Sequence, residues 1–225
     1  MQRNSLPSNK TAFPVISNKN PLILASASPR RKRLLAGIRL PFKQVTSMID
    51  ETDGEAGWSD PAHMTLELSR KKALDVFSRN SGSWVLGADT IVVIDNRILG
   101  KPENEEAARR MLSVLSGRRH TVITGFSILD PSGGTAHTEA VTTQVEIKRL
   151  GSREIEFYIG TGEGSDKAGS YAIQGIGSFM VKAIFGSYSN VVGLPLCEVT
   201  EALVAIGALD TFPPSPSPPF SPAHS

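Results

Sequence analysis

The stretch LILASASPRRKRLLAGI, residues 22–38, has the pattern of a short strand, a loop of small residues and a helix. The apolar run 22–24 is typical of a buried strand. Ser28 and Pro29 are typical of a helix start, because a serine cap accepts a backbone N–H bond and proline at the first helical position loses no useful donor. The same alternation of strand and helix continues along the chain and indicates the fold class.

Outside this unit, strand and helix patterns interleave up to residue 206. We expect strands at 42–48, 121–129 and 138–147, two strands within 84–102 around a turn at 95–97, and helices at 60–78, 104–115, 152–159 and 195–206. On the helix 60–78, Leu66, Leu74 and Phe77 are expected to face the core. Residues 160–193 are rich in glycine. The predicted class is α/β, with a mixed central sheet flanked by helices.

Composition and length indicate one globular domain, since the 225 residues are 40% hydrophobic and 20% charged. The Pro-, Ser- and Asn-rich ends predict a flexible extension at 1–20, a domain at 21–209 and a disordered tail at 210–225. No apolar run is long enough for a membrane span or a signal peptide, so we expect a cytoplasmic protein without membrane contact. The single cysteine, Cys197, fits a reducing compartment.

Four cations occupy the first turn of the helix that starts at Pro29, from Arg30 to Arg33. The helix dipole disfavours each exposed cation there by roughly 0.3–1 kcal/mol, and a bound anion such as phosphate would reverse that effect. A solvated basic face or a nucleic-acid patch is the alternative. A net charge of only +2 argues against binding to a nucleic acid polymer.

Other charged residues also stand in unusual places. Asp89 interrupts an apolar strand, where an unpaired charge would cost several kcal/mol, so it belongs either to a structural salt bridge or to a cleft. Lys101 and Lys167 lie in restricted turns, and Glu51 in an acidic loop. Cations suited to phosphate oxygens, together with carboxylates suited to Mg²⁺ or Mn²⁺, are typical of a site for polyphosphate and a divalent metal.

The chain resembles the Maf or septum-formation-inhibitor-like nucleoside triphosphate pyrophosphatases. The resemblance rests on motifs that occur in the family's order: LILASASPRRKRLL, LSRKKA, GADTIVV, LGKPENEEAARRML, LSGRRHTVITG, DKAGSYAIQG and NVVGLPL. It implies an α/β fold of two lobes with a cleft between them, and frequent homodimers. It also implies metal-dependent hydrolysis of a nucleoside triphosphate to monophosphate and pyrophosphate.

The resemblance further implies a role for individual residues. Asp89 matches the proton acceptor, and Glu51 and Asp89 match residues near the metal. The substrate-binding positions are Ser26, Arg30, Arg31, Lys72, Thr90, Lys101, Lys167 and Gln174. Among them, Arg30, Thr90 and Gln174 match the subclass that prefers dTTP and UTP. Two alternatives stay open: the sister subclass that acts on 7-methyl-GTP, and a nucleotide-binding regulator of septum formation.

Overall fold

The computed structural model describes residues 13–49 and 60–213. The strands are β1 (Leu22–Ala25), β2 (Phe42–Val45), β3 (Val85–Ile94), β4 (Arg97–Leu99), β5 (Arg119–Leu129), β6 (Thr135–Ile147) and β7 (Val181–Phe185). The helices are α1 (Pro29–Gly37), α2 (Pro61–Phe77), α3 (Glu105–Leu115), α4 (Ser152–Gly160), α5 (Tyr188–Val192) and α6 (Leu196–Ala205), with short 3-10 segments η2 (Ala168–Ser170) and η3 (Gly175–Met180).

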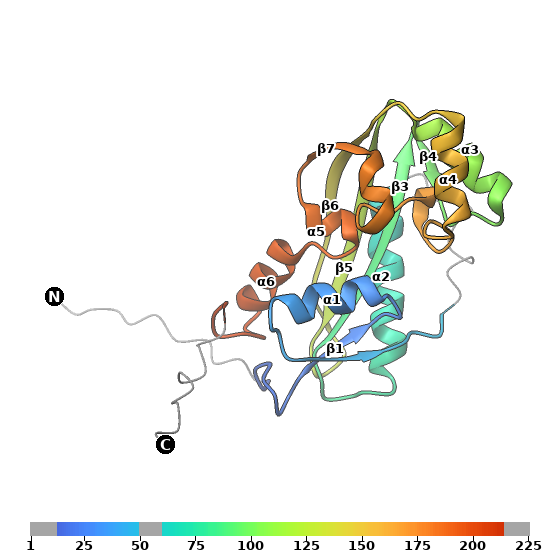
Figure 1. Ribbon diagram of the computed structural model, residues 1–225. Helices are drawn as coiled ribbons and strands as arrows, with labels where there is room; N and C mark the ends of the chain where they lie inside the picture. The colour runs from blue at the N-terminus through green and yellow to red at the C-terminus, as the bar shows by residue number, and fades with distance from the viewer. Residues whose placement is uncertain (1–12, 50–59, 214–225) are drawn as a thin grey trace, which may run out of the picture.

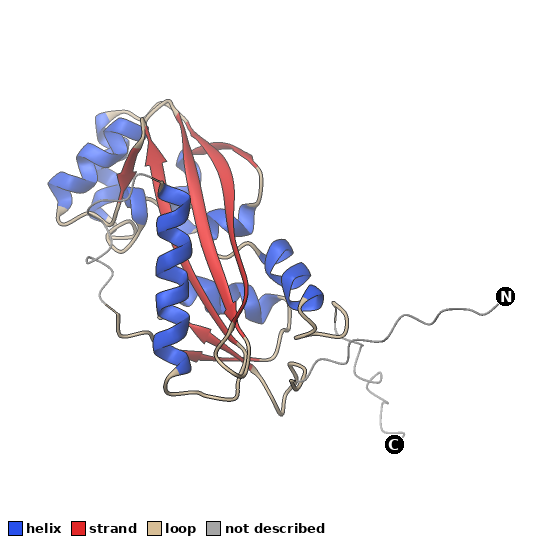
Figure 2. Ribbon diagram, turned by 180° about the vertical axis from the view of Figure 1, so that it is seen from behind, coloured by secondary structure: helices blue, strands red, loops and turns tan. Residues whose placement is uncertain are grey.

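The described strands form one mixed sheet in the order β2-β1-β3-β5-β6-β7, with β4 paired to β3. β1 runs parallel to β2 and β3, and the remaining pairs are antiparallel. The helix α2 lies across one face of the sheet (Figure 2), whereas α1, α5 and α6 lie on the other face (Figure 1). The predicted α/β class with a mixed sheet flanked by helices is therefore confirmed.

Two separate apolar clusters, one towards each end of the long strands, form two lobes. The first cluster contains Leu86 and Phe126 and packs against α1 and α6. The second contains Val92 and Val122 and packs against α3 and α4. Since Leu86 and Val92 both belong to β3, and Phe126 and Val122 both belong to β5, the long strands pass through both lobes. The two-lobed arrangement follows from this shared framework.

The helix α2 approaches the sheet closely. A Cβ atom on Gly87 would lie 2.1 Å from the carbonyl oxygen of Ser69, and one on Gly125 would lie 2.5 Å from Thr65. Glycine at these two sheet positions is therefore required by the helix packed over them.

The predicted inner face of α2 is partly wrong. Leu74 is exposed, and Leu66 and Phe77 are only half-buried, although Phe77 does pack against a small core cluster. The buried side chains are instead Met64, Thr65, Leu68, Ser69, Lys72, Ala73 and Val76. The small residues Thr65, Ser69 and Ala73 lie where the helix approaches the sheet most closely, so apolar size alone does not reveal the inner face.

The expectation that residues 1–20 lie outside the fold is wrong for residues 13–20. Ile16 is buried in the first cluster, and its N–H donates to the carbonyl of Ala208 at 2.8 Å. The indole N–H of Trp84 donates to the carbonyl of Pro14 at 2.8 Å, and Phe13 meets the Trp84 ring edge-on. The few apolar residues of this polar segment therefore complete the core. At the other end, Phe212 packs against the same cluster, within the predicted tail, whose residues 214–225 lie outside the described part.

The glycine-rich segment 160–193 contains more regular structure than its composition indicates. The strand β7 pairs with β6, and α5 follows it. β7 forms because it pairs with the long edge of β6, and this pairing joins segments that are distant in the sequence.

Within the described ranges, no helix combines the length and apolarity that a membrane crossing needs.

Candidate active site

A pocket of about 630 Å³ opens between the two lobes. Its walls come from the loop after β1, the start of α1, one side of α2, the middle of β3, the turn after β4, residues 166–174 and the end of α5. Nine of the residues predicted from sequence line it: Ser26, Arg30, Arg31, Lys72, Asp89, Thr90, Lys101, Lys167 and Gln174. The structure thus brings these residues together, although their individual roles remain predictions. Glu51, expected near the metal, lies outside the described residues.

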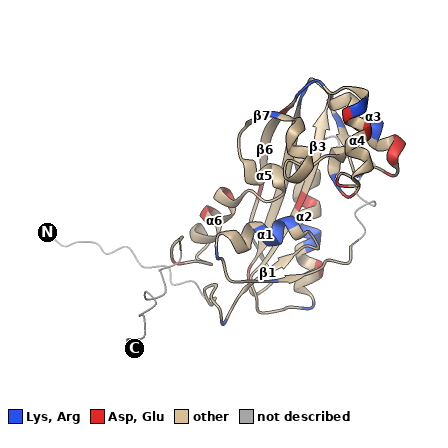
Figure 3. Ribbon diagram, viewed as in Figure 1, with Lys and Arg blue, Asp and Glu red and all other residues tan. Residues whose placement is uncertain are grey.

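The start of α1 is shaped by side-chain caps. The Ser28 hydroxyl accepts from the backbone N–H of Arg31 at 3.4 Å, and the Ser26 hydroxyl accepts from the N–H of Ser28 at 3.2 Å. Gln44 of β2 supports this loop, since its side-chain amide donates to the carbonyl of Ser26 at 2.8 Å. Sequence reasoning assigned no role to Gln44. Figure 3 shows basic residues on the ribbon of α1, and two of them, Arg30 and Arg31, line the pocket.

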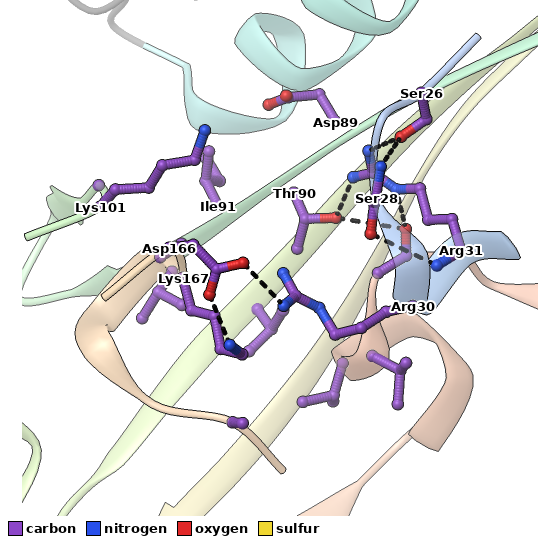
Figure 4. A pocket seen from close by; sticks show the side chains of 18 of the residues that line it. Ser26, Ser28, Arg30, Arg31, Asp89, Thr90, Ile91, Lys101, Asp166 and Lys167 are labelled. Atoms are coloured by element: carbon purple, nitrogen blue, oxygen red, sulfur yellow. Dashed lines mark hydrogen bonds and ion pairs between the residues drawn. The ribbon is translucent and has the colours of Figure 1, made fainter. Parts of the chain in front are cut away.

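The two arginines of the SPRR motif have different surroundings. The buried guanidinium of Arg31 donates to the carbonyl of Gly193 at 2.7 Å and to the Thr90 hydroxyl at 3.0 Å, so it links α1 to β3 and to the segment after α5. Arg30 is 26% exposed, and its Nη1 lies 3.6 Å from Oδ2 of Asp166. Arg30 therefore reaches into the open pocket, while Arg31 also holds the pocket walls together (Figure 4).

Asp89 forms a buried ion pair with Lys72. The Lys72 Nζ donates to Oδ1 of Asp89 at 2.6 Å, and the two side chains are 6% and 11% exposed. Both sequence interpretations of Asp89 therefore apply, because the residue has a salt-bridge partner and also lines the pocket. Of the two carboxylate oxygens of Asp89, only Oδ1 has a hydrogen-bond partner among the described residues.

Asp166 lies between cations of the two lobes. Its Oδ1 accepts from Nζ of Lys167 at 2.5 Å, and its Oδ2 faces Arg30 (Figure 4). Burial acts to raise the pKa of Asp166, but the hydrogen bond and charge of Lys167 outweigh it, and the pKa lies below its usual value. Arg30 and Lys167 therefore already contact one anionic group, the Asp166 carboxylate. The same guanidinium and ammonium groups are suited to binding a phosphate group.

A histidine and a tyrosine support the pocket from the second cluster. Nε2 of buried His120 lies 2.7 Å from the hydroxyl of Tyr171, a residue that lines the pocket. Nδ1 of His120 has no hydrogen-bond partner among the described residues. Burial lowers the pKa of His120 from 6.5 to about 4, so the imidazole is neutral in the folded protein at neutral pH.

This burial predicts a specific acid sensitivity. Below pH 6.5 the unfolded chain binds a proton at His120, whereas the folded state does not bind it until the pH nears 4. The free energy of unfolding therefore falls as the pH drops from 6.5 towards 4. The free energy of unfolding at pH 5 should be about 2 kcal/mol lower than at pH 7 through this residue. Denaturant titrations of the wild type and His120→Gln at both pH values measure the effect. If the variant keeps the full difference, His120 is not its source.

The chain is similar to known proteins over most of its length. Residues 21–206 match the family described as Maf-like protein. A protein named dTTP/UTP pyrophosphatase from Syntrophotalea carbinolica is 49% identical over 193 residues, which cover 85% of this chain and 87% of that protein. A protein of the same name from Halalkalibacterium halodurans is 48% identical over 85% of this chain and 99% of its own length. A solved HAM1 protein from Coxiella burnetii aligns over 58% of this chain and 74% of its own, at 16% identity and a TM-score of 0.38, which is too low to support an argument. On the family match and these identities, the chain belongs to the Maf-like protein family.

Proposed function

We propose that this protein hydrolyses dTTP and UTP to the nucleoside monophosphate and pyrophosphate. The observation that carries the proposal is the pocket itself, in which a carboxylate held by Lys72 faces the same space as Arg30, Lys101 and Lys167. The name shared by relatives that are 48–49% identical supports the substrates.

In the proposed reaction, water attacks the α-phosphorus and Asp89 accepts the proton from that water. The bond between the α-phosphorus and the bridging oxygen breaks, and pyrophosphate leaves with the bond's electrons. The ion pair with Lys72 holds Asp89 in place. Arg30, Lys101 and Lys167 bind phosphate oxygens, where their positive charges offset the charge that develops on the leaving group.

A divalent metal fits this donor set. Within the described residues, no group of three His, Cys, Asp or Glu side chains could hold a metal alone. Mg²⁺ is commonly bound by one or two carboxylates together with substrate phosphates and water, and Asp89 offers such a carboxylate. We propose Mg²⁺ or Mn²⁺, held by Asp89 and Glu51. The ion would supply positive charge to the phosphate oxygens.

The selectivity residues expected from the resemblance lie on different walls of the pocket. Thr90 is held by Thr124, whose hydroxyl oxygen is 2.9 Å away, and by Arg31. Gln174 lies on the segment before η3. We assign Arg30, Thr90 and Gln174 to recognition of pyrimidine nucleotides, as opposed to 7-methyl-GTP. We also propose that the protein acts in the cytoplasm as a homodimer.

The proposal is tested by the products of purified protein. Incubation with dTTP, UTP and 7-methyl-GTP, with Mg²⁺ or Mn²⁺, should release pyrophosphate from the first two, and only when metal is present. In water labelled with ¹⁸O, the label should enter the monophosphate, because attack occurs at the α-phosphorus. Direct release of orthophosphate would contradict the mechanism. Preference for 7-methyl-GTP would favour the sister subclass, and tight nucleotide binding without turnover would favour the regulator.

A further inference from the structure

The turn that carries Gln174 has a conformation that few sequences can adopt. Gly175 has φ +71°, in the left-handed region that favours glycine. A Cβ atom on Gly175 would lie 2.1 Å from Oε1 of Glu163, and one on Gly177 would lie 2.3 Å from the carbonyl of Ala172. The turn therefore packs directly against the Glu163 carboxylate.

Glu163 binds this turn through its backbone. Oε1 accepts from the N–H of Ile176 at 3.0 Å, and Oε2 accepts from the N–H of Gly177 at 2.8 Å. Burial acts to raise the pKa of Glu163, but these two N–H donors, a hydrogen bond with Tyr158 and the charge of Lys167 together outweigh it, so the pKa lies below its usual value and the charged form is favoured. A carboxylate that accepts two backbone hydrogen bonds holds them more strongly than a neutral group would.

The other end of the turn is also held. The N–H of Ala172 donates to the hydroxyl of the buried Tyr158 at 3.0 Å. Gln174 therefore lies between two fixed points, Ala172 on one side and Ile176 on the other. Tyr158, which holds Ala172, belongs to α4, and Glu163, which holds Ile176, lies in the segment directly after α4. The side chain of Gln174 depends on them for its place in the pocket wall.

Neighbouring carboxylates serve a different purpose. Glu154 and Glu156 of α4 pair with Lys148 and Arg109 at the surface. The Glu163 carboxylate forms no salt bridge with another described residue, and its partners are the turn's own N–H groups and the hydroxyl of Tyr158. Its backbone carbonyl accepts from Nζ of Lys167, a contact that does not involve the side chain. Substituting the Glu163 side chain removes its charge attraction to Lys167, but Lys167 keeps its hydrogen bonds to the Glu163 carbonyl and to Asp166, so the main effect should fall on the turn.

We propose that Glu163 is a positioning residue for nucleobase recognition: its carboxylate fixes the turn 172–177 so that Gln174 meets the base, independently of phosphate binding. This inference rests on the proposed function. It divides the pocket into a base-recognition part, which depends on Glu163, and a phosphate-binding part around Lys101, which does not depend on Glu163.

The two products of the proposed reaction test this division, because dTMP carries the base and pyrophosphate does not. We expect Glu163→Ala to weaken dTMP binding about tenfold or more in titration calorimetry, with less than a twofold change for pyrophosphate. Glu163→Gln keeps one acceptor oxygen but turns its amide N–H₂ towards the other donor, so its effect should be intermediate. Glu156→Gln, which removes a surface carboxylate of α4, is the matched control and should bind both products like the wild type.

Hydrogen exchange gives a readout that needs no ligand. In Glu163→Ala the amides of Ile176 and Gly177 lose their acceptors and should exchange faster, while amides of β3 should not change. Equal weakening of dTMP and pyrophosphate, or an unchanged dTMP affinity, would overturn the inference and leave the proposed function intact. A wild-type protein that binds neither product would instead overturn the proposed function and this inference with it.

Discussion

Replacing Asp89 with asparagine should lower kcat for dTTP by roughly 10²–10⁴-fold, the usual loss when a general base is removed. The amide is nearly isosteric with the carboxylate and can still accept a hydrogen bond from Lys72, so the packing around β3 should persist. It cannot accept a proton from water. Nucleotide affinity should therefore change far less than the rate, which steady-state kinetics and direct dTTP binding measure side by side.

Two further measurements define what Asp89 does. If its main role is to bind metal, Asp89→Asn should regain much of its rate as the Mg²⁺ or Mn²⁺ concentration is raised. Arg30→Ala provides the contrast, because loss of a cation from the open pocket should weaken dTTP binding as well as turnover. Turnover close to that of the wild type in Asp89→Asn would remove this residue from the mechanism and favour the regulator.

Replacing Lys72 with methionine should destabilise the fold by about 3 kcal/mol and also abolish most activity. The substitution removes the cation that faces Asp89 at 2.6 Å, and breaking a buried ion pair by deleting one partner costs about 3–5 kcal/mol. We expect the lower end, because water in the pocket can reach the carboxylate. Urea unfolding at pH 7 measures the loss.

The double variant Lys72→Met with Asp89→Asn distinguishes an unpaired charge from simple loss of packing. Removing both charges should recover part of the stability lost in Lys72→Met, since no buried carboxylate is then left without its cation. Additive losses in the double variant would show that the pair contributes little. Arg70→Met is a matched control, since it removes a cation of α2 that pairs with Glu67 at the surface and should change stability by less than about 1 kcal/mol.

Local patterns in the sequence predicted most of the secondary structure. The cap at Ser28 and the turn between β3 and β4 depend on residues close in sequence, and the structure confirms both. The interrupted strand around Asp89 indicated a charge that needed a partner. The family resemblance then identified nine pocket residues, because motifs keep their order along the chain even when the contacts between them are long-range.

Only the tertiary structure decided which segments meet. It pairs Asp89 with Lys72, 17 positions away, distinguishes Arg30 from Arg31, and decides which face of α2 is buried. It also brings residues 13–20 and β7 into the fold and places Glu163 against the turn of Gln174. By itself, the sequence determined most of the elements and the chemical groups of the pocket, since helix caps and hydrophobic periodicity act over a few residues. The pairing of those groups depends on how closely segments that are distant in the sequence approach one another in the fold. A local sequence pattern holds no information about that approach.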